Sequence, residues 1–68
     1  MNEETFNLSI RKFLKMVGVK SQHEIEQAVS KARAQGMISG NETLPVSMNL
    51  HIGQLKFDVK FDGEINLE

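Results

Sequence analysis

The sequence predicts a small α+β domain with two layers, in which an N-terminal helical hairpin packs on a three-stranded antiparallel meander, in the order ααβββ. Three observations predict this class. Apolar residues recur at spacings of three and four in the first half of the chain, they alternate with polar residues in the second half, and glycines separate the segments. The length of 68 residues fits one small domain, residues 1–68.

The first helix is expected over residues 3–17 or so. Asn2 is a good N-cap, because its side chain can accept a hydrogen bond from a free backbone N–H of the first turn. Gly18 is suited to end this helix in the left-handed conformation. The apolar stripe consists of Phe6, Ile10, Phe13, Leu14 and Val17.

The second helix is expected over residues 22–35. Ser21 and Glu24 form the pattern of a capping box, in which each side chain bonds the backbone N–H of the other residue. Gly36 is placed to end the helix. Its inward face is small and consists of Ile25, Ala28, Val29 and Ala32. Together the two helices would form an αα-hairpin.

The rest of the chain predicts three strands, at 45–52, 55–61 and 64–68. A two-residue turn at Gly53 and Gln54 pairs Leu50 with Phe57 and places the alternating apolar side chains of both strands on one face. A three-residue loop ending at Gly63 would return the last strand on the same face. The apolar face consists of Val46, Met48, Leu50, Ile52, Leu55, Phe57, Val59, Phe61, Ile65 and Leu67.

Composition limits the class of protein. With 40% hydrophobic and 25% charged residues the chain is globular rather than disordered. The N-terminus lacks the basic start and apolar run of a signal peptide, and no apolar run approaches the ~20 residues of a membrane span. The chain has no cysteine. We therefore expect a soluble cytoplasmic protein with no membrane association.

Three stretches of the chain, NEETFNLSIRKFLKMVGVKSQHEIEQAV, NETLP and KFDGEINLE, resemble a family of short uncharacterised bacterial proteins, a domain of unknown function. The similarity covers nearly the whole chain. It implies a bacterial origin and brings no functional residues with it.

Enzymatic activity is not expected. The two histidines, His23 and His51, have no nearby ligands that would complete a metal site, and Lys56 is expected opposite His51, where its charge would oppose metal binding. The chain has no phosphate-binding glycine loop, and a domain of this size has little room for a small-molecule cleft. We expect no catalytic residue, cofactor, metal or small-molecule substrate.

Nucleic-acid binding is an alternative function. The segment from Phe13 to Gly36 has the cadence of a helix-turn-helix, with amide side chains on the second helix and lysines near it. Net charge opposes this hypothesis, since the chain carries −1 at pH 7. The candidate face consists of Lys12, Lys15, Lys20, His23, Gln27, Ser30, Lys31 and Arg33.

The favoured function is a small non-enzymatic module that binds another protein or a second copy of itself as a homodimer. The core of so short a chain is marginal, and the first strand is an edge guarded only by Pro45 and small polar residues. Two apolar residues, Leu8 and Met16, also fall off the helical stripe. The candidate interaction surface consists of Leu8, Lys12, Met16, Ser47, Asn49 and His51.

Overall fold

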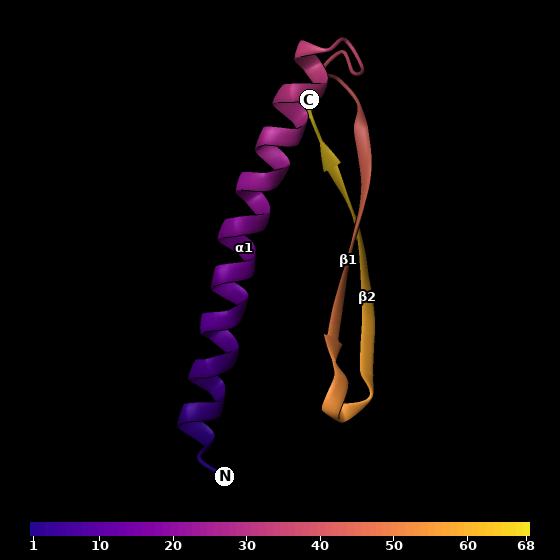
Figure 1. Ribbon diagram of the computed structural model, residues 1–68. Helices are drawn as coiled ribbons and strands as arrows, with labels where there is room; N and C mark the ends of the chain where they lie inside the picture. Colours follow the sequence, from indigo (N-terminus) through magenta and orange to yellow (C-terminus); the bar gives the residue numbers. More distant parts are fainter. The chain divides into compact units, whose positions relative to one another are not determined.

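The structure is a computed structural model that describes all 68 residues, and it is α+β overall. It contains the helix α1 (Glu3–Ala34), the strand β1 (Thr43–Ile52), a short 3-10 turn η1 (Gly53–Leu55) and the strand β2 (Phe57–Asn66), as Figure 1 shows. The chain divides into two compact units, Met1–Gln35 and Gly36–Glu68. The first unit is the helix, and the second is a loop followed by a β-hairpin.

Both ends of α1 lie where the sequence predicts a helix end. The Asn2 side chain accepts a hydrogen bond from the backbone N–H of Thr5 at 3.0 Å, which confirms the N-cap. At the other end the N–H of Gln35 bonds the carbonyl of Lys31 at 3.1 Å. Gly36 follows with φ of +74°, the left-handed conformation that favours glycine, and this confirms the helix end predicted there.

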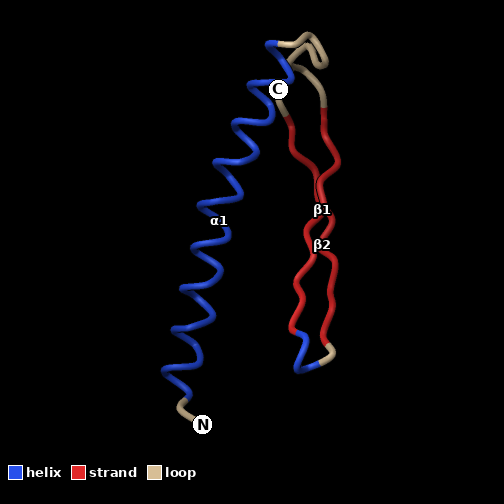
Figure 2. Tube along the Cα trace, in the orientation of Figure 1, coloured by secondary structure: helices blue, strands red, loops and turns tan.

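The predicted helical hairpin is wrong, because α1 is one helix of 32 residues that passes through Gly18 and Ser21, as the unbroken helical tube in Figure 2 shows. Gly18 does not have a positive φ and therefore does not cap a helix. A glycine inside a helix costs only about 1 kcal/mol, whereas breaking the helix forfeits several backbone hydrogen bonds and requires a new nucleus. Continuation is therefore favoured, and Ser21 lies in the helix interior instead of at a cap.

The turn between the strands is longer than predicted. Lys56, in the left-handed conformation with φ of +51°, donates its backbone N–H to the carbonyl of Gly53 at 3.1 Å and closes the turn. As a result Leu50 lies opposite Val59, instead of opposite Phe57. The shift is by two residues, so the apolar side chains stay on one face as predicted.

The predicted three-stranded meander is also wrong. The sheet has two strands, and β2 continues without a turn through Asp62 and Gly63 to Asn66. Gly63 pairs with Val46 inside the ladder and has no positive φ. Apolar residues occupy odd positions on both sides of Gly63, so a straight strand keeps them on one face without any loop.

Neither unit encloses a core of its own. No residue of α1 is buried, and both strands are mostly exposed. A single helix and a two-stranded hairpin each have only one layer, so their apolar side chains have nothing within the unit to pack against. No helix combines the length and hydropathy needed to cross a bilayer.

Candidate interaction surfaces

A row of small and apolar side chains runs along α1 at spacings of three and four residues, which places it on one face of the helix. The bulky members near its N-terminus are exposed, with Phe6 at 48% and Phe13 at 47%, whereas Val17 and Ile25 are half-buried. Leu14 and Val29 flank the row. We call this row the α1 stripe; it consists of Phe6, Ile10, Phe13, Val17, Ser21, Ile25, Ala28 and Ala32.

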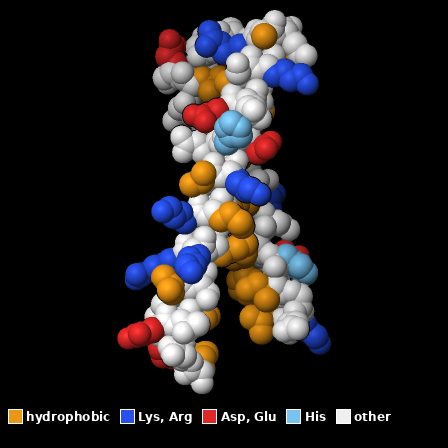
Figure 3. Space-filling view, turned by 60° about the vertical axis from the view of Figure 1, so that its left-hand side comes forward, with side chains coloured by type: hydrophobic (Ala, Val, Ile, Leu, Met, Phe, Trp, Pro, Cys, Tyr) orange, Lys and Arg blue, Asp and Glu red, His pale blue; other side chains and the backbone are white.

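The hairpin has a second apolar surface. Strand alternation sends every second side chain of β1 and β2 to one face, and cross-strand partners such as Leu50 and Val59 or Met48 and Phe61 lie side by side there. Phe61 is 56% exposed. Figure 3 shows hydrophobic side chains exposed at the molecular surface. The hairpin apolar face consists of Leu44, Val46, Met48, Leu50, Ile52, Phe57, Val59, Phe61 and Ile65.

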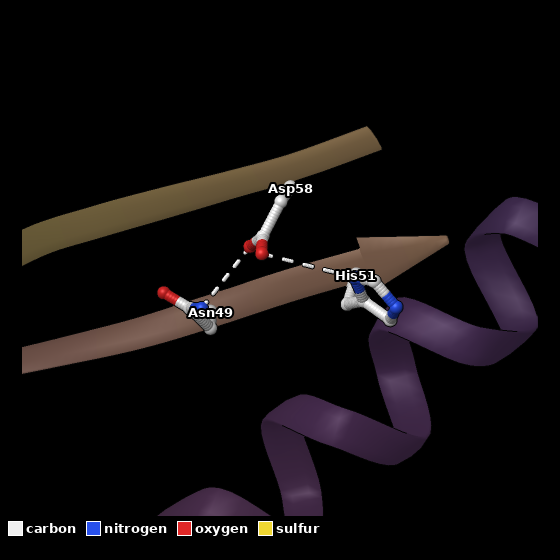
Figure 4. A network of polar contacts seen from close by, with 3 residues as sticks. All are labelled: Asn49, His51 and Asp58. Carbon is white, nitrogen blue, oxygen red and sulfur yellow. Dashed lines mark hydrogen bonds and ion pairs between the residues drawn. The ribbon is translucent and has the colours of Figure 1, made fainter. Parts of the chain in front are cut away.

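The opposite face of the hairpin carries a small polar network (Figure 4). The amide of Asn49 donates to Asp58 Oδ1 at 3.1 Å, and His51 Nδ1 lies 3.8 Å from Asp58 Oδ2. The expectation that Lys56 lies opposite His51 is wrong, because the shifted register places Asp58 there. The side chains of His51 and Asp58 are 66% and 60% exposed, so this is an open surface pair.

Glu42 organises the loop that precedes β1. Its carboxylate accepts backbone hydrogen bonds from Ser39 at 2.8 Å, Gly40 at 2.9 Å and Asn41 at 3.2 Å. The bond from Ser39, followed by that from Gly40, lowers the pKa of Glu42 from 4.5 to about 2. The backbone carbonyl of Glu42 also accepts from Leu67, which extends the ladder by one bond. The carboxylate thus satisfies the N–H groups of a tight loop, as a bound anion would in a backbone nest.

The candidate interaction residues fall into two groups of three. Leu8, Lys12 and Met16 are four residues apart and form one row on α1, away from the α1 stripe. Leu8 is 54% and Met16 47% exposed. The other three, Ser47, Asn49 and His51, lie on the polar face of β1. Each group shares a face, and the two groups belong to different units.

The helix-turn-helix prediction is wrong, because the segment from Phe13 to Gly36 contains no turn before Gln35. The five lysine and arginine residues of the candidate face instead lie along one long helix, within an arc of about 160° at 100° per residue. A shallow open hollow on α1 includes part of the candidate face. It is lined by His23, Glu26, Gln27, Ser30, Lys31 and Ala34.

Sequence reasoning missed two residues of the polar surface. Asp58 was not matched to His51, because the expected register was two residues off. The role of Glu42 was not predicted, although a carboxylate just after Ser-Gly-Asn can accept hydrogen bonds from the N–H groups of such a loop. No three side chains among His, Cys, Asp and Glu come together as a metal site would require.

The whole chain, residues 1–68, matches one protein-family model, which is described as "Family of unknown function (DUF6494)". One family model therefore spans both units. Neither the curated proteins nor the solved structures contain a match to the chain.

Proposed function

The chain belongs to a family of unknown function (DUF6494), and we propose that it is a small non-enzymatic module that associates with a second copy of itself. The observation that carries this proposal is the pair of open apolar surfaces, the α1 stripe and the hairpin apolar face, neither of which is covered within its own unit.

Burial of apolar surface favours association of two copies. A two-stranded hairpin is at best marginally stable in water, and a lone helix relies on packing of its apolar face. Burying apolar surface stabilises by roughly 25 cal/mol per Å². Both units therefore gain stability from a partner surface of the same apolar character, and a second copy supplies two such surfaces.

The sheet adds a second route to association. With only two strands, both β1 and β2 are edges, and each has a row of backbone N–H and C=O groups free to pair. β1 is the less protected edge, because its polar side chains carry no Lys, Asp or Glu, whereas β2 carries four charged residues (Asp58, Lys60, Asp62 and Glu64). Strand addition from a second copy would satisfy these backbone groups.

The polar side chains support a binding role better than a catalytic one. His51 and Asp58 are 3.8 Å apart on an open face with no nucleophile beside them. A catalytic pair works in an enclosed site where water is excluded.

Absence of cysteine favours a reducing compartment such as the bacterial cytoplasm as the place of action.

The experiment is the dependence of the unfolding midpoint on protein concentration. If folding is coupled to association, the thermal midpoint rises with concentration by mass action. The matched variants are Met48→Lys, on the hairpin apolar face, and Ser47→Lys, one residue away on the polar face. We expect Met48→Lys to weaken association and Ser47→Lys to leave it unchanged. A midpoint independent of concentration would contradict the proposal.

A further inference from the structure

We infer that α1 pairs with α1 of a second copy in antiparallel orientation, about a two-fold axis that passes beside Val19. This inference rests on the proposed self-association and adds its geometry. Such a pair requires a continuous helix, because a break at Gly18 would separate the two halves of the α1 stripe.

The α1 stripe has the same spacing read from either end. Successive members are separated by four, three, four, four, four, three and four residues. Every member at position i is therefore matched by another at position 38 − i, so Phe6 corresponds to Ala32 and Val17 to Ser21. A two-fold axis perpendicular to the helix superposes these positions. The mean spacing of about 3.7 residues is slightly longer than one helical turn, so the stripe winds by about 80° around α1 between Phe6 and Ala32, and two paired helices cross with a right-handed twist to keep it in contact.

Side-chain sizes favour the antiparallel arrangement over the parallel one. In the antiparallel pair each bulky side chain of the N-terminal half meets a smaller one of the C-terminal half: Phe6 meets Ala32, and Ile10 meets Ala28. In a parallel pair Phe6 would meet Phe6 while Ala32 met Ala32, which crowds one end and leaves a gap at the other. Interfaces pack best when large and small side chains alternate across them.

Charges at the helix ends favour the same orientation. The first turn is acidic, with Glu3 and Glu4, and the last turn is basic, with Lys31 and Arg33. Antiparallel pairing brings the acidic first turn of each helix to the level of the basic last turn of the other, and it does so twice by symmetry. It also opposes the two helix dipoles. Parallel pairing would place like charges together at both ends.

Disulfide formation tests the orientation, because the chain has no native cysteine. Within one helix, positions 6 and 32 are about 39 Å apart and cannot be joined. Under mild oxidation we expect Phe6→Cys and Ala32→Cys to form covalent dimers when mixed, and each alone to form at least tenfold fewer. The matched control is the mixture of Lys12→Cys and Glu26→Cys, which share a level in the antiparallel pair but lie away from the stripe and should stay uncrosslinked.

A pair of introduced charges gives a second measurement that does not depend on cysteine. Phe13→Lys and Ile25→Glu should each weaken self-association several-fold, and the double variant should recover part of it, because the introduced charges at positions 13 and 25 attract one another across the antiparallel interface. Far-UV circular dichroism checks that each variant remains helical.

The outcomes separate this inference from the proposed function. If Phe6→Cys crosslinks alone, or the double charge variant shows no recovery, the antiparallel geometry is overturned although the chain self-associates. If no mixture crosslinks while sedimentation shows a dimer, a different surface forms the contact and the geometry is again overturned. If sedimentation shows only monomer, because α1 packs on its own hairpin or stays uncovered, both proposals fail.

Discussion

Val46 and Gly63 face one another across the hairpin as cross-strand partners, and a Cβ on Gly63 would lie 3.7 Å from Val46 Cγ1. This distance is an ordinary van der Waals contact. Gly63 is therefore a gap in the hairpin apolar face within an uninterrupted strand, although it follows Asp62 in what reads as a turn signal.

Gly63→Ala should stabilise the hairpin by about 0.5–1 kcal/mol, because alanine loses less conformational entropy in a strand and fills the space beside Val46. Chemical unfolding followed by circular dichroism measures the change. A loss of stability of similar size would indicate that Gly63 adopts a left-handed turn conformation, as the three-stranded meander requires.

Gly18→Ala should stabilise α1 by about 1 kcal/mol, because Gly18 lies in the helix interior and nothing stands within 4 Å of an added Cβ. Gly36→Ala is the matched control. It should destabilise by about 1 kcal/mol, since Gly36 has φ of +74° at the helix end. Helicity and unfolding free energy of both variants measure this contrast, and the opposite order would restore the broken-helix interpretation.

The Glu42 carboxylate should keep its hydrogen bonds to the loop amides until the solution is strongly acidic. Hydrogen bonds from Ser39 and Gly40 lower the pKa of Glu42 from 4.5 to about 2. A lowered folded-state pKa means that the carboxylate stabilises the loop fully above about pH 4.5 and that this contribution is lost as the pH falls towards 2. An NMR titration of the Ser39 and Gly40 amides should show a midpoint near 2, and Glu42→Gln should abolish it. A midpoint at 4.5 would show that the carboxylate does not bond these amides.

Asp58→Ala should change the free energy of unfolding by no more than about 1 kcal/mol, because its partners His51 and Asn49 are exposed and the ion pair is long. His51→Ala should behave alike. Urea unfolding of both variants checks this expectation. A loss of several kcal/mol would mean that the network is covered by a partner surface in solution.

Local signals in the sequence predicted local structure well. Asn2 caps α1 and Gly36 ends it, as expected from one side-chain oxygen and one left-handed glycine. The prediction that alternating apolar residues form one face of the hairpin is also confirmed. Glycine was the source of error, because a residue that permits a cap or turn does not require one. Gly18 and Gly63 both lie inside regular elements, where hydrogen-bonded continuation is favoured over a break.

The sequence predicted which face of the hairpin a candidate residue occupies, but it did not predict the cross-strand neighbour of that residue. His51 was placed on the polar face correctly, but its neighbour was not, because Leu55 and Lys56 belong to the turn and shift every pair by two. The family resemblance was confirmed over the whole chain and brought no function with it. Periodicity predicted two separate apolar stripes on two helices, and the single α1 stripe follows only from the continuity of the 32-residue helix.

Sedimentation equilibrium of the unmodified protein over a wide range of concentration tests self-association most directly. The open α1 stripe and hairpin apolar face predict a mass that rises to twice that of the chain and stays there in high salt, because apolar burial does not depend on charge screening. A mass equal to that of a single chain at every concentration would contradict the proposal.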